Sequence, residues 1–334
     1  MYDDEIRSFV EAVEPDLSYQ GTEGVMAMMF ESAQNMIALE DFIHTDAYQE
    51  GAKEIGQKIW EKIKKFFKAI VELIKKFIAK IKSFFIAVRT RLTKAAAVAM
   101  KKLGEMAKNL VGASKETINY RGLNEAEFTK FASQIERISK EDAKHIEAQI
   151  NKYGADIVAN GKEIPVMDRK DALDIRIGHI IKDANHTNFI SKAKEVLFAE
   201  KTMEASKEAF AKEYKDGILS KLDKAYDTIM KAESVQLMNT SEVQKNIENG
   251  LKRNNVDDAT ANKIVKTAMT NINSNIAVHN TLVLSASQVV ASVSMSAYKS
   301  MLAAVMRGIK ARIKSAVKKD NKEEKVATES VAIL

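Results

Sequence analysis

The feature that most constrains this sequence is an apolar stripe that runs without interruption through residues 57–94. Its side chains recur at alternating steps of four and three residues, which places them on one face of an α-helix. Neither Gly nor Pro interrupts the segment, so the pattern predicts one amphipathic helix of about 55 Å, at about 1.5 Å per residue. The candidate apolar face consists of Trp60, Ile63, Phe67, Ile70, Ile74, Phe77, Ile81 and Phe84.

Basic side chains fill the opposite face of this predicted helix. Residues 58–102 carry fourteen Lys or Arg residues against Glu61 and Glu72, a net charge of +12. Lysine binds phosphate as a point charge, and this face has almost no Arg, Asn or Gln with which to read base edges, so the predicted polyanion contacts are to phosphate. The candidate polyanion-binding residues are Lys58, Lys62, Lys64, Lys65, Lys68, Lys75, Lys76, Lys80, Lys82, Arg89 and Arg91.

Three uses of such a helix are open from the residues alone. In the first, the apolar face is buried in a bundle and the lysines only keep the surface soluble. In the second, the apolar face is likewise buried in a bundle, and the lysines bind nucleic acid or another polyanion. A wide apolar face beside a lysine-rich face is also typical of a helix that lies on a membrane surface.

An acidic segment precedes the basic helix. Residues 1–57 carry thirteen acids and two bases, a net charge of −11, although the whole chain has a net charge of +6. Two interpretations follow from opposite charges so close in sequence. The acidic segment lies permanently against the basic helix and neutralises it, or it masks the helix until it is displaced or removed.

Composition predicts an all-α protein, an elongated multi-helix bundle with one long basic amphipathic helix. The 334 residues include two prolines, thirteen glycines and no cysteine, and helix-forming residues dominate. We expect a weakly structured acidic leader over 1–56, the basic helix over 57–111, a helical body over 112–319 and a disordered tail over 320–334. Asn124 with Glu127 is a helix-start signal. Within the body we expect helices over 168–184, 188–216, 217–238, 240–254 and 256–278, and an extended segment only at 164–166.

Residues 281–298 contain no charged side chain, and eighteen residues meet the minimum length of a membrane span. Five serines, a threonine and a glutamine make the segment polar for a span, so we expect a buried central helix. A second basic cluster follows it, comprising Arg307, Lys310, Arg312, Lys314, Lys318 and Lys319.

No catalytic or cofactor motif is present, whether a phosphate-binding glycine loop, a zinc-protease helix or a nucleophile elbow. The five histidines show no metal-ligand spacing, and Asp183 with His186 is better interpreted as a surface polar pair than as a metal site. We therefore expect a protein that is not an enzyme and that carries no catalytic residue, cofactor or metal.

The order of these parts resembles a known family. Phe30-Glu31-Ser32-Ala33 and Ala38-Leu39-Glu40 precede Ile59-Trp60-Glu61-Lys62-Ile63-Lys64-Lys65-Phe66-Phe67, and the lysine-rich helix ends in Arg89-Thr90-Arg91-Leu92. Over about the first 95 residues the chain resembles the internal head or prohead-core proteins of large tailed bacteriophages. The resemblance implies a virion structural protein inside the head, in the host cytoplasm during assembly. It implies contacts with other capsid proteins and with double-stranded DNA without sequence preference.

The resemblance also implies trimming by a prohead protease after a glutamate that has a small residue two places before it. Glu23, Glu40 and Glu329 fit this pattern in segments expected to be accessible. Cleavage after Glu40 would remove nine acids and one base and raise the net charge from +6 to +14. A membrane-active, pore-forming-like protein that acts through residues 58–94 is the alternative function.

Overall fold

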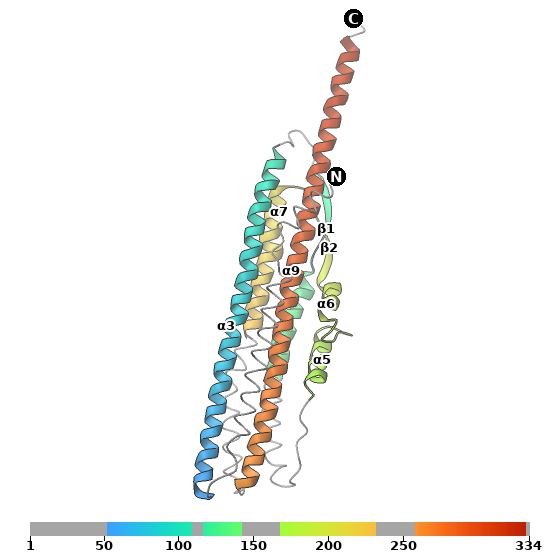
Figure 1. The fold of residues 1–334 in the computed structure, drawn as a ribbon. Helices are drawn as coiled ribbons and strands as arrows, with labels where there is room; N and C mark the ends of the chain where they lie inside the picture. The colour runs from blue at the N-terminus through green and yellow to red at the C-terminus, as the bar shows by residue number, and fades with distance from the viewer. Residues whose placement is uncertain (1–51, 109–115, 142–167, 232–257, 332–334) are drawn as a thin grey trace.

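The computed structural model of the chain describes residues 52–108, 116–141, 168–231 and 258–331, and Figure 1 shows an elongated helical bundle. Of the described residues, 84% are helical, and two short strands form a small sheet. The prediction of an all-α bundle with a long basic amphipathic helix is confirmed. The predicted leader over 1–56 lies almost entirely outside the described residues.

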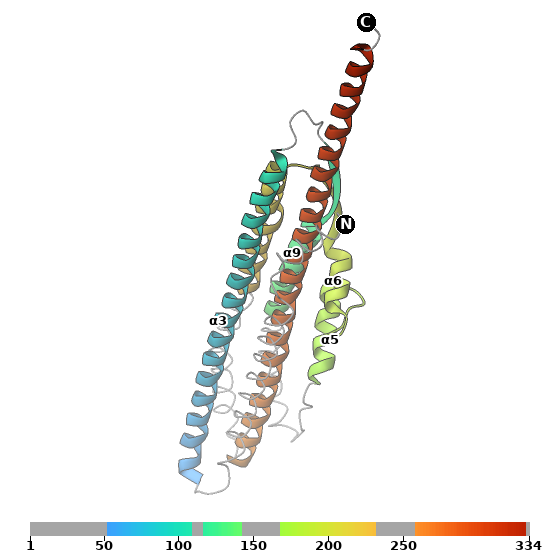
Figure 2. The ribbon, with the colours of Figure 1, turned by 45° about the horizontal axis from the view of Figure 1, so that its top comes forward.

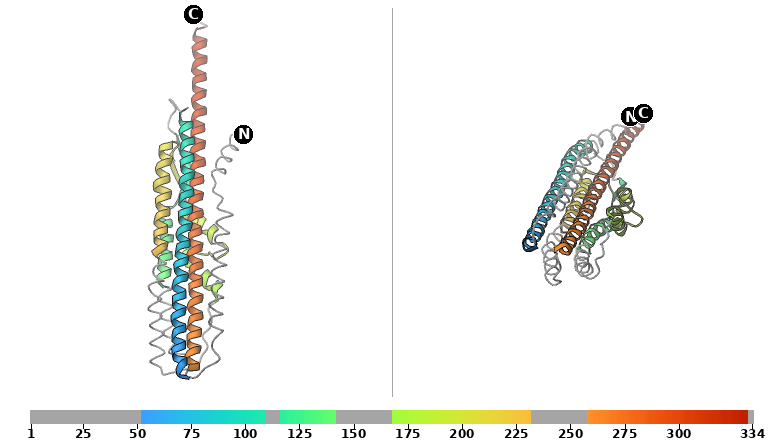
Figure 3. Two further views of the ribbon diagram at one scale, coloured as in Figure 1. Left: turned by 60° about the vertical axis from the view of Figure 1, so that its left-hand side comes forward. Right: turned by 60° about the horizontal axis from the view of Figure 1, so that its bottom comes forward.

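Two long helices set the length of the bundle. α3 spans Ala52–Ala107, close to the predicted 57–111, and α9 spans Asp258–Val331. The two helices run side by side and in the same direction, so their C-terminal ends point to the same end of the molecule (Figures 1, 2 and 3). At about 1.5 Å per residue they measure about 84 and about 110 Å. The last turns of α9 project beyond the other elements (Figure 1).

Residues 320–331, for which a disordered tail was expected, form the last turns of α9. This stretch has no Gly or Pro, and five of its twelve residues are Lys or Glu. These residues lose little side-chain freedom in a helix. The helix therefore continues where a solvated charged tail was expected.

The small sheet pairs segments that are far apart in the sequence. β1 spans Thr117–Leu123 and β2 spans Phe198–Glu204, and they are antiparallel, with Thr117 opposite Glu204 and Leu123 opposite Phe198. The prediction of one helix over 188–216 was wrong here, because β2 interrupts it. The sequence of β2, FAEKTME, favours helix by local propensity, and only its pairing with β1 makes it a strand.

Shorter helices connect and flank these elements. Residues 125–141 are helical, and the Asn124 side chain accepts a hydrogen bond from the Glu127 backbone N–H at 3.4 Å, as the start signal predicted. α5 spans Arg169–Ile180 and α6 spans Phe189–Leu197. Asp168 caps α5 by accepting two backbone N–H groups. The predicted helix over 240–254 and the predicted extended segment 164–166 lie outside the described residues.

A third rod consists of α7 (Lys207–Glu213), the π-helical turn η1 (Tyr214–Leu219) and a helix over 220–231. It packs antiparallel on the C-terminal half of α3. The Tyr214 hydroxyl donates to Thr93 Oγ1 at 3.2 Å, whereas further along the rod the Tyr226 ring lies 4.7 Å from that of Phe85. Increasing residue numbers on the rod thus meet decreasing numbers on α3.

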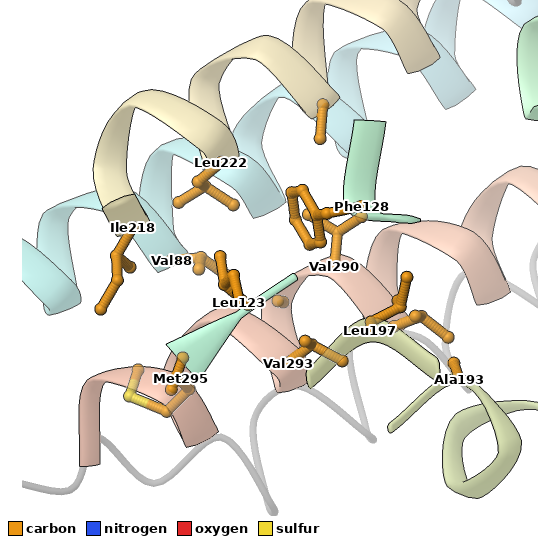
Figure 4. Packing of buried hydrophobic residues seen from close by; sticks show 14 of the residues in the cluster. Val88, Leu123, Phe128, Ala193, Leu197, Ile218, Leu222, Val290, Val293 and Met295 are labelled. Atoms are coloured by element: carbon orange, nitrogen blue, oxygen red, sulfur yellow. The ribbon is translucent and has the colours of Figure 1, made fainter. Parts of the chain in front are cut away.

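The hydrophobic core lies around α9 (Figure 4). Val88 of α3, Leu123 of β1, Leu197 of α6, Ile218 of η1 and Val290 of α9 are each at most 2% exposed. α3, β1, α6 and η1 therefore each pack an apolar face against α9, which lies at the centre of the core.

The uncharged segment 281–298 is a buried central helix within α9, as expected. Leu282, Val283, Val289 and Val290 are fully or almost fully buried. Its serines are compatible with this position because a serine can hydrogen-bond its own helix. The Ser287 hydroxyl, for example, donates to the Val283 carbonyl at 2.7 Å.

By length and composition alone, one described stretch, Ser274–Val317, is long and apolar enough to cross a membrane. In the folded chain 72% of its most apolar window is buried inside the bundle. A core helix of a bundle meets the same criterion, so this stretch is explained by its place in the fold.

Candidate polyanion-binding face

The predicted apolar face of α3 is the face that packs into the bundle. Phe67, Ile70, Ile74, Phe77 and Ile81 are all buried. The side chains of Trp60 and Ile63 lie outside those the structure describes. The apolar stripe of α3 is therefore in contact with protein along its described length. This burial fits both interpretations that place the stripe in a bundle, whether the lysines only keep the surface soluble or bind a polyanion.

The stripe shifts by one residue toward the C-terminal half of α3. Phe84 was predicted to lie on the apolar face, but it is only half-buried, whereas Phe85 is 4% exposed and contacts Tyr226. The prediction used a repeat of 3.5 residues. A straight helix has 3.6 residues per turn and drifts by about 20° per heptad relative to that repeat, so the buried position moves from Phe84 to Phe85.

The opposite face of α3 presents bases to solvent. The exposed members of the predicted set are Lys64, Lys65, Lys68, Lys75, Lys76, Lys82 and Arg89, and Lys80 and Arg91 are half-exposed. Lys94, Lys101 and Lys102 extend the exposed face toward the C-terminal end. Lys58 and Lys62 lie on α3, but their side chains are not described. Between residues 64 and 102 the only acid in the sequence is Glu72.

Acidic neighbours neutralise part of this face. Arg89 Nε lies 3.1 Å from Asp223 Oδ1 on the adjacent rod, and Lys75 Nζ lies 3.1 Å from Glu72 Oε1. Both pairs are more than 40% exposed, so each is worth at most about 1 kcal/mol and can be exchanged for a phosphate. Lys65, Lys68, Lys76 and Lys82 have no ion-pair partner within the described part of the chain. These four lysines are termed the α3 lysine face.

A half-buried ionic network, which the sequence did not indicate, joins the small sheet to the rod. Lys201 Nζ of β2 lies 3.2 Å from Glu213 Oε1 and 3.8 Å from Glu125 Oε1, and Lys221 Nζ lies 2.9 Å from Glu125 Oε2. The hydrogen bond from Lys221 holds the pKa of Glu125 below its ordinary value. Burial, together with the nearby Glu213 carboxylate, raises the pKa of Tyr120. These residues come from separate elements, so no sequence spacing connects them.

Gly217 in the π-helical turn makes room for this network. A Cβ at this position would overlap the Glu213 carboxylate. Turns of this kind are frequent at functional sites, but here the groups around the turn are paired with one another. We therefore assign the network a structural role in joining sheet and rod.

His186 pairs with a residue other than the Asp183 that the sequence suggested. His186 Nδ1 lies 2.8 Å from Asp174 Oδ1, and the same oxygen accepts the His186 backbone N–H at 2.7 Å. This backbone hydrogen bond is the main cause of a lowered pKa at Asp174. Asp183 instead occupies a turn with a φ of 61°. In the described ranges, no group of three or more His, Asp or Glu side chains is placed to hold a metal ion.

The predicted cleavage sites are only partly visible. Glu23 and Glu40 lie outside the described residues, whereas Glu329 lies in the last turn of α9. A protease binds an extended segment, so cleavage after Glu329 would require this turn to unwind. Comparison with protein-family models, curated proteins and solved structures finds no match to this chain.

Proposed function

We propose that this chain is a structural protein without catalytic activity, which binds double-stranded DNA through phosphate contacts of the α3 lysine face. The observation that supports the proposal is the division of α3 into two faces with different surroundings. Its apolar stripe is buried in the bundle, and its lysines remain in solvent for most of its length. Such a surface supplies the electrostatic attraction that drives non-specific binding to DNA.

The described surface has no large exposed aromatic side chain, and this favours duplex DNA over single strands as the ligand. Binding of unpaired bases relies on exposed aromatic side chains for stacking. In the described part of the chain the exposed large hydrophobic residues are Ile86, Val98, Ile175, Ile190, Val196 and Val317, and none is aromatic. Lysines without stacking partners favour the phosphate backbone.

The setting of this binding is proposed from the resemblance of the first 95 residues to phage internal head proteins. We place the protein inside the virion, in contact with other capsid proteins and packaged DNA, and in the host cytoplasm during assembly. The acidic leader, with a net charge of −11 over residues 1–57, would mask the lysines until cleavage after Glu23 or Glu40 removes it.

The test of DNA binding is a salt titration with a mixed-sequence duplex of about 20 base pairs. The variant carries Lys65→Gln, Lys68→Gln, Lys76→Gln and Lys82→Gln. Each lost phosphate contact lowers the slope of log affinity against log salt by about 0.9, so we expect the slope to fall by about 3.6.

The matched control removes four exposed lysines elsewhere, by Lys130→Gln, Lys140→Gln, Lys170→Gln and Lys182→Gln. This control has the same net charge as the α3 variant. Its slope of log affinity against log salt should stay close to that of the wild type. Equal losses in the two variants would contradict binding by the α3 lysine face, and absence of duplex binding by the wild type would contradict the function itself.

Mass spectrometry of both termini, on protein from its native source, tests the proposed maturation. A chain that begins at Gly24 or Asp41 supports cleavage of the leader. An intact chain from Met1 to Leu334 would remove the unmasking step and leave the DNA-binding proposal to the salt titration.

The membrane-active alternative is favoured by one observation, the apolar stretch Ser274–Val317. It requires the bundle to open, because this stretch and the apolar stripe of α3 are both buried. Leakage of anionic vesicles by a protein that does not bind duplex DNA would support it over the structural role.

A further inference from the structure

α9 meets solvent along one narrow line. Most positions from residue 277 to 309 are buried, and the half-buried or exposed positions of the line recur every three or four residues, which places them on one side of the helix. The line consists of Thr281, Ser285, Gln288, Ser292, Ser296, Lys299, Ala303, Arg307, Lys310 and Lys314, with Ser300 and Ala311 at its margin. Nearly all other positions of this stretch face the core.

The two halves of this line differ in charge. Every member from Thr281 to Ser296 is an uncharged polar residue, whereas four of the five from Lys299 to Lys314 are basic. No acid occurs in the sequence between Asp258 and Asp320, so no carboxylate of α9 itself lies within this stretch. Within the line from Thr281 to Lys314, charge is therefore confined to the part from Lys299 onward.

The parallel arrangement of the long helices brings the basic part of the α9 line to the same end of the bundle as the C-terminal part of α3. Both helices run toward the same end of the molecule and lie side by side in each view (Figures 1 and 3). Lys94, Lys101 and Lys102 are exposed on the corresponding part of α3. Two basic segments that are about 200 residues apart in the sequence thus share one end of the bundle.

Contacts from the short elements hold these basic segments in place. Arg312 Nη1 donates to the Ala205 carbonyl at 2.8 Å, which ties α9 to the turn after β2. Gly308 allows this close approach, because a Cβ there would lie 2.6 Å from Ala205 Cβ and 2.7 Å from Ile118 Cγ2. The Lys207 side chain adds a further base beside Gly104 of α3.

Acids at this end are fewer than bases. In residues 94–108 of α3 and 307–314 of α9 the only acid in the sequence is Glu105, and Glu116, Glu204 and Glu208 lie on neighbouring segments, against nine bases. Those bases are Lys94, Lys101, Lys102, Lys108, Lys207, Arg307, Lys310, Arg312 and Lys314. The excess positive charge favours a polyanion, and Arg307, Lys310 and Lys314 rise along the helix by steps of about 4.5 and about 6 Å. Such a row can follow successive phosphates of a duplex strand.

We propose that this end of the bundle, formed by Lys94, Lys101 and Lys102 of α3 with Arg307, Lys310 and Lys314 of α9, is a second and composite contact for the backbone of double-stranded DNA. We term these six residues the basic end. The inference rests on the proposed function and adds to it where along the bundle the DNA is bound. DNA is held where the C-terminal part of α3 shares one end of the bundle with residues 307–314 of α9, and the uncharged half of the α9 line is left without contact.

The first test is the full-length double variant Arg307→Gln with Lys314→Gln, measured with the same duplex by fluorescence anisotropy from about 50 to about 200 mM salt. Both side chains are exposed, so circular dichroism and the melting temperature should remain unchanged. Loss of two phosphate contacts should lower the salt slope by about 1.8, and Arg307→Lys with Lys314→Arg should restore it.

The matched control is Lys170→Gln with Lys182→Gln, which makes the same change in net charge on α5 and in the turn that follows it. Its slope should stay close to that of the wild type. If both pairs lower the slope equally, the effect is one of net charge and the basic end is not a contact.

The outcome also separates this inference from the proposed function. If the α3 lysine-face variant lowers the slope and the α9 pair does not, DNA binding stands and the basic end is overturned. If the wild type shows no duplex binding, both proposals fail.

The absence of cysteine in the chain allows a second test of position. A photo-crosslinker attached at Ser315→Cys, on the exposed basic part of α9, should crosslink to the duplex. The same label at Ser292→Cys, on the uncharged half, should not. Equal crosslinking from both sites would overturn the position along the bundle that we propose.

Discussion

α3 and α9 are neighbouring parallel helices of the same bundle, yet they meet solvent in opposite proportions. α3 buries one stripe and exposes lysines over the rest of its surface, whereas α9 is surrounded by protein between residues 277 and 309 except along one line. The difference follows from position, because α3 lies at the edge of the bundle and α9 contacts α3, α5, α6 and the strands. A helix at the edge is free to display charge along its length, and a central helix displays it only where its neighbours end.

The largest effect is expected when an aspartate is introduced at a buried position of α9 and, for comparison, at an exposed position of α3. Val290→Asp in α9 would bury a carboxylate at a position that is 0% exposed, which we expect to cost more than about 4 kcal/mol and to prevent stable folding. Ile86→Asp in α3, at a position that is 55% exposed, should change stability by less than about 0.5 kcal/mol. Thermal unfolding followed by circular dichroism measures both, and similar losses would contradict the assignment of α3 to the edge.

Truncation of two adjacent phenylalanines locates the buried stripe on α3. Phe85→Ala removes a buried ring that contacts Tyr226, and we expect a cost of about 3–5 kcal/mol. Phe84→Ala removes a half-buried ring and should cost at least about 1 kcal/mol less, because less apolar surface returns to water. Urea titration of the two variants gives the difference, and the opposite order would restore the 3.5-residue repeat that the sequence suggested.

Gly308 tests how closely α9 must approach the sheet. Gly308→Val would place side-chain atoms against Ala205 and Ile118, and such overpacking should cost about 1–3 kcal/mol. Gly104→Val on α3 is the matched control, since its nearest neighbour is the flexible Lys207 side chain at 3.5 Å. Thermal unfolding compares the two variants, and a smaller loss at Gly308 than at Gly104 would contradict the close approach.

The smallest expected effect is a change in the pH dependence of stability near α5. The pKa of Asp174 is lowered in the folded chain, mainly by the His186 backbone N–H. A lowered folded-state pKa gives stability that is present above the unfolded pKa of about 3.9 and is lost as pH falls through the folded value. Asp174→Asn should therefore flatten the stability profile below about pH 4. Denaturant titrations at several pH values measure this, with Asp171→Asn, also on α5, as the control.

The amphipathic helix was predictable from the sequence because its information is local. The period of apolar residues and the absence of Gly and Pro predicted it over 57–94, and the expected basic helix over 57–111 lies within five residues of the observed ends, at Ala52 and Ala107. The burial of 281–298 was predictable because a long uncharged helix with small residues fits a core. The start after Asn124 carried its own capping signal.

The small sheet was not predictable from local patterns. β2 has a helix-favouring sequence, and its partner β1 lies about 75 residues before it. The pairing of Arg89 with Asp223, 134 positions apart, is equally invisible to spacing arguments. In each case the two partners are far apart in the chain, and no local sequence pattern indicates that they pair.

The sequence by itself determined that the protein is helical, that α3 carries a lysine face and that a second basic cluster follows the uncharged segment of α9, because periodicity and charge are properties of local chain segments. The tertiary structure alone decided that α3 lies at the edge and α9 at the centre, and that both helices point in the same direction (Figure 2). The physical reason is that the direction of each helix, and the elements that pack against it, depend on burying the apolar faces of all elements simultaneously. That choice brings the two basic segments to one end of the bundle.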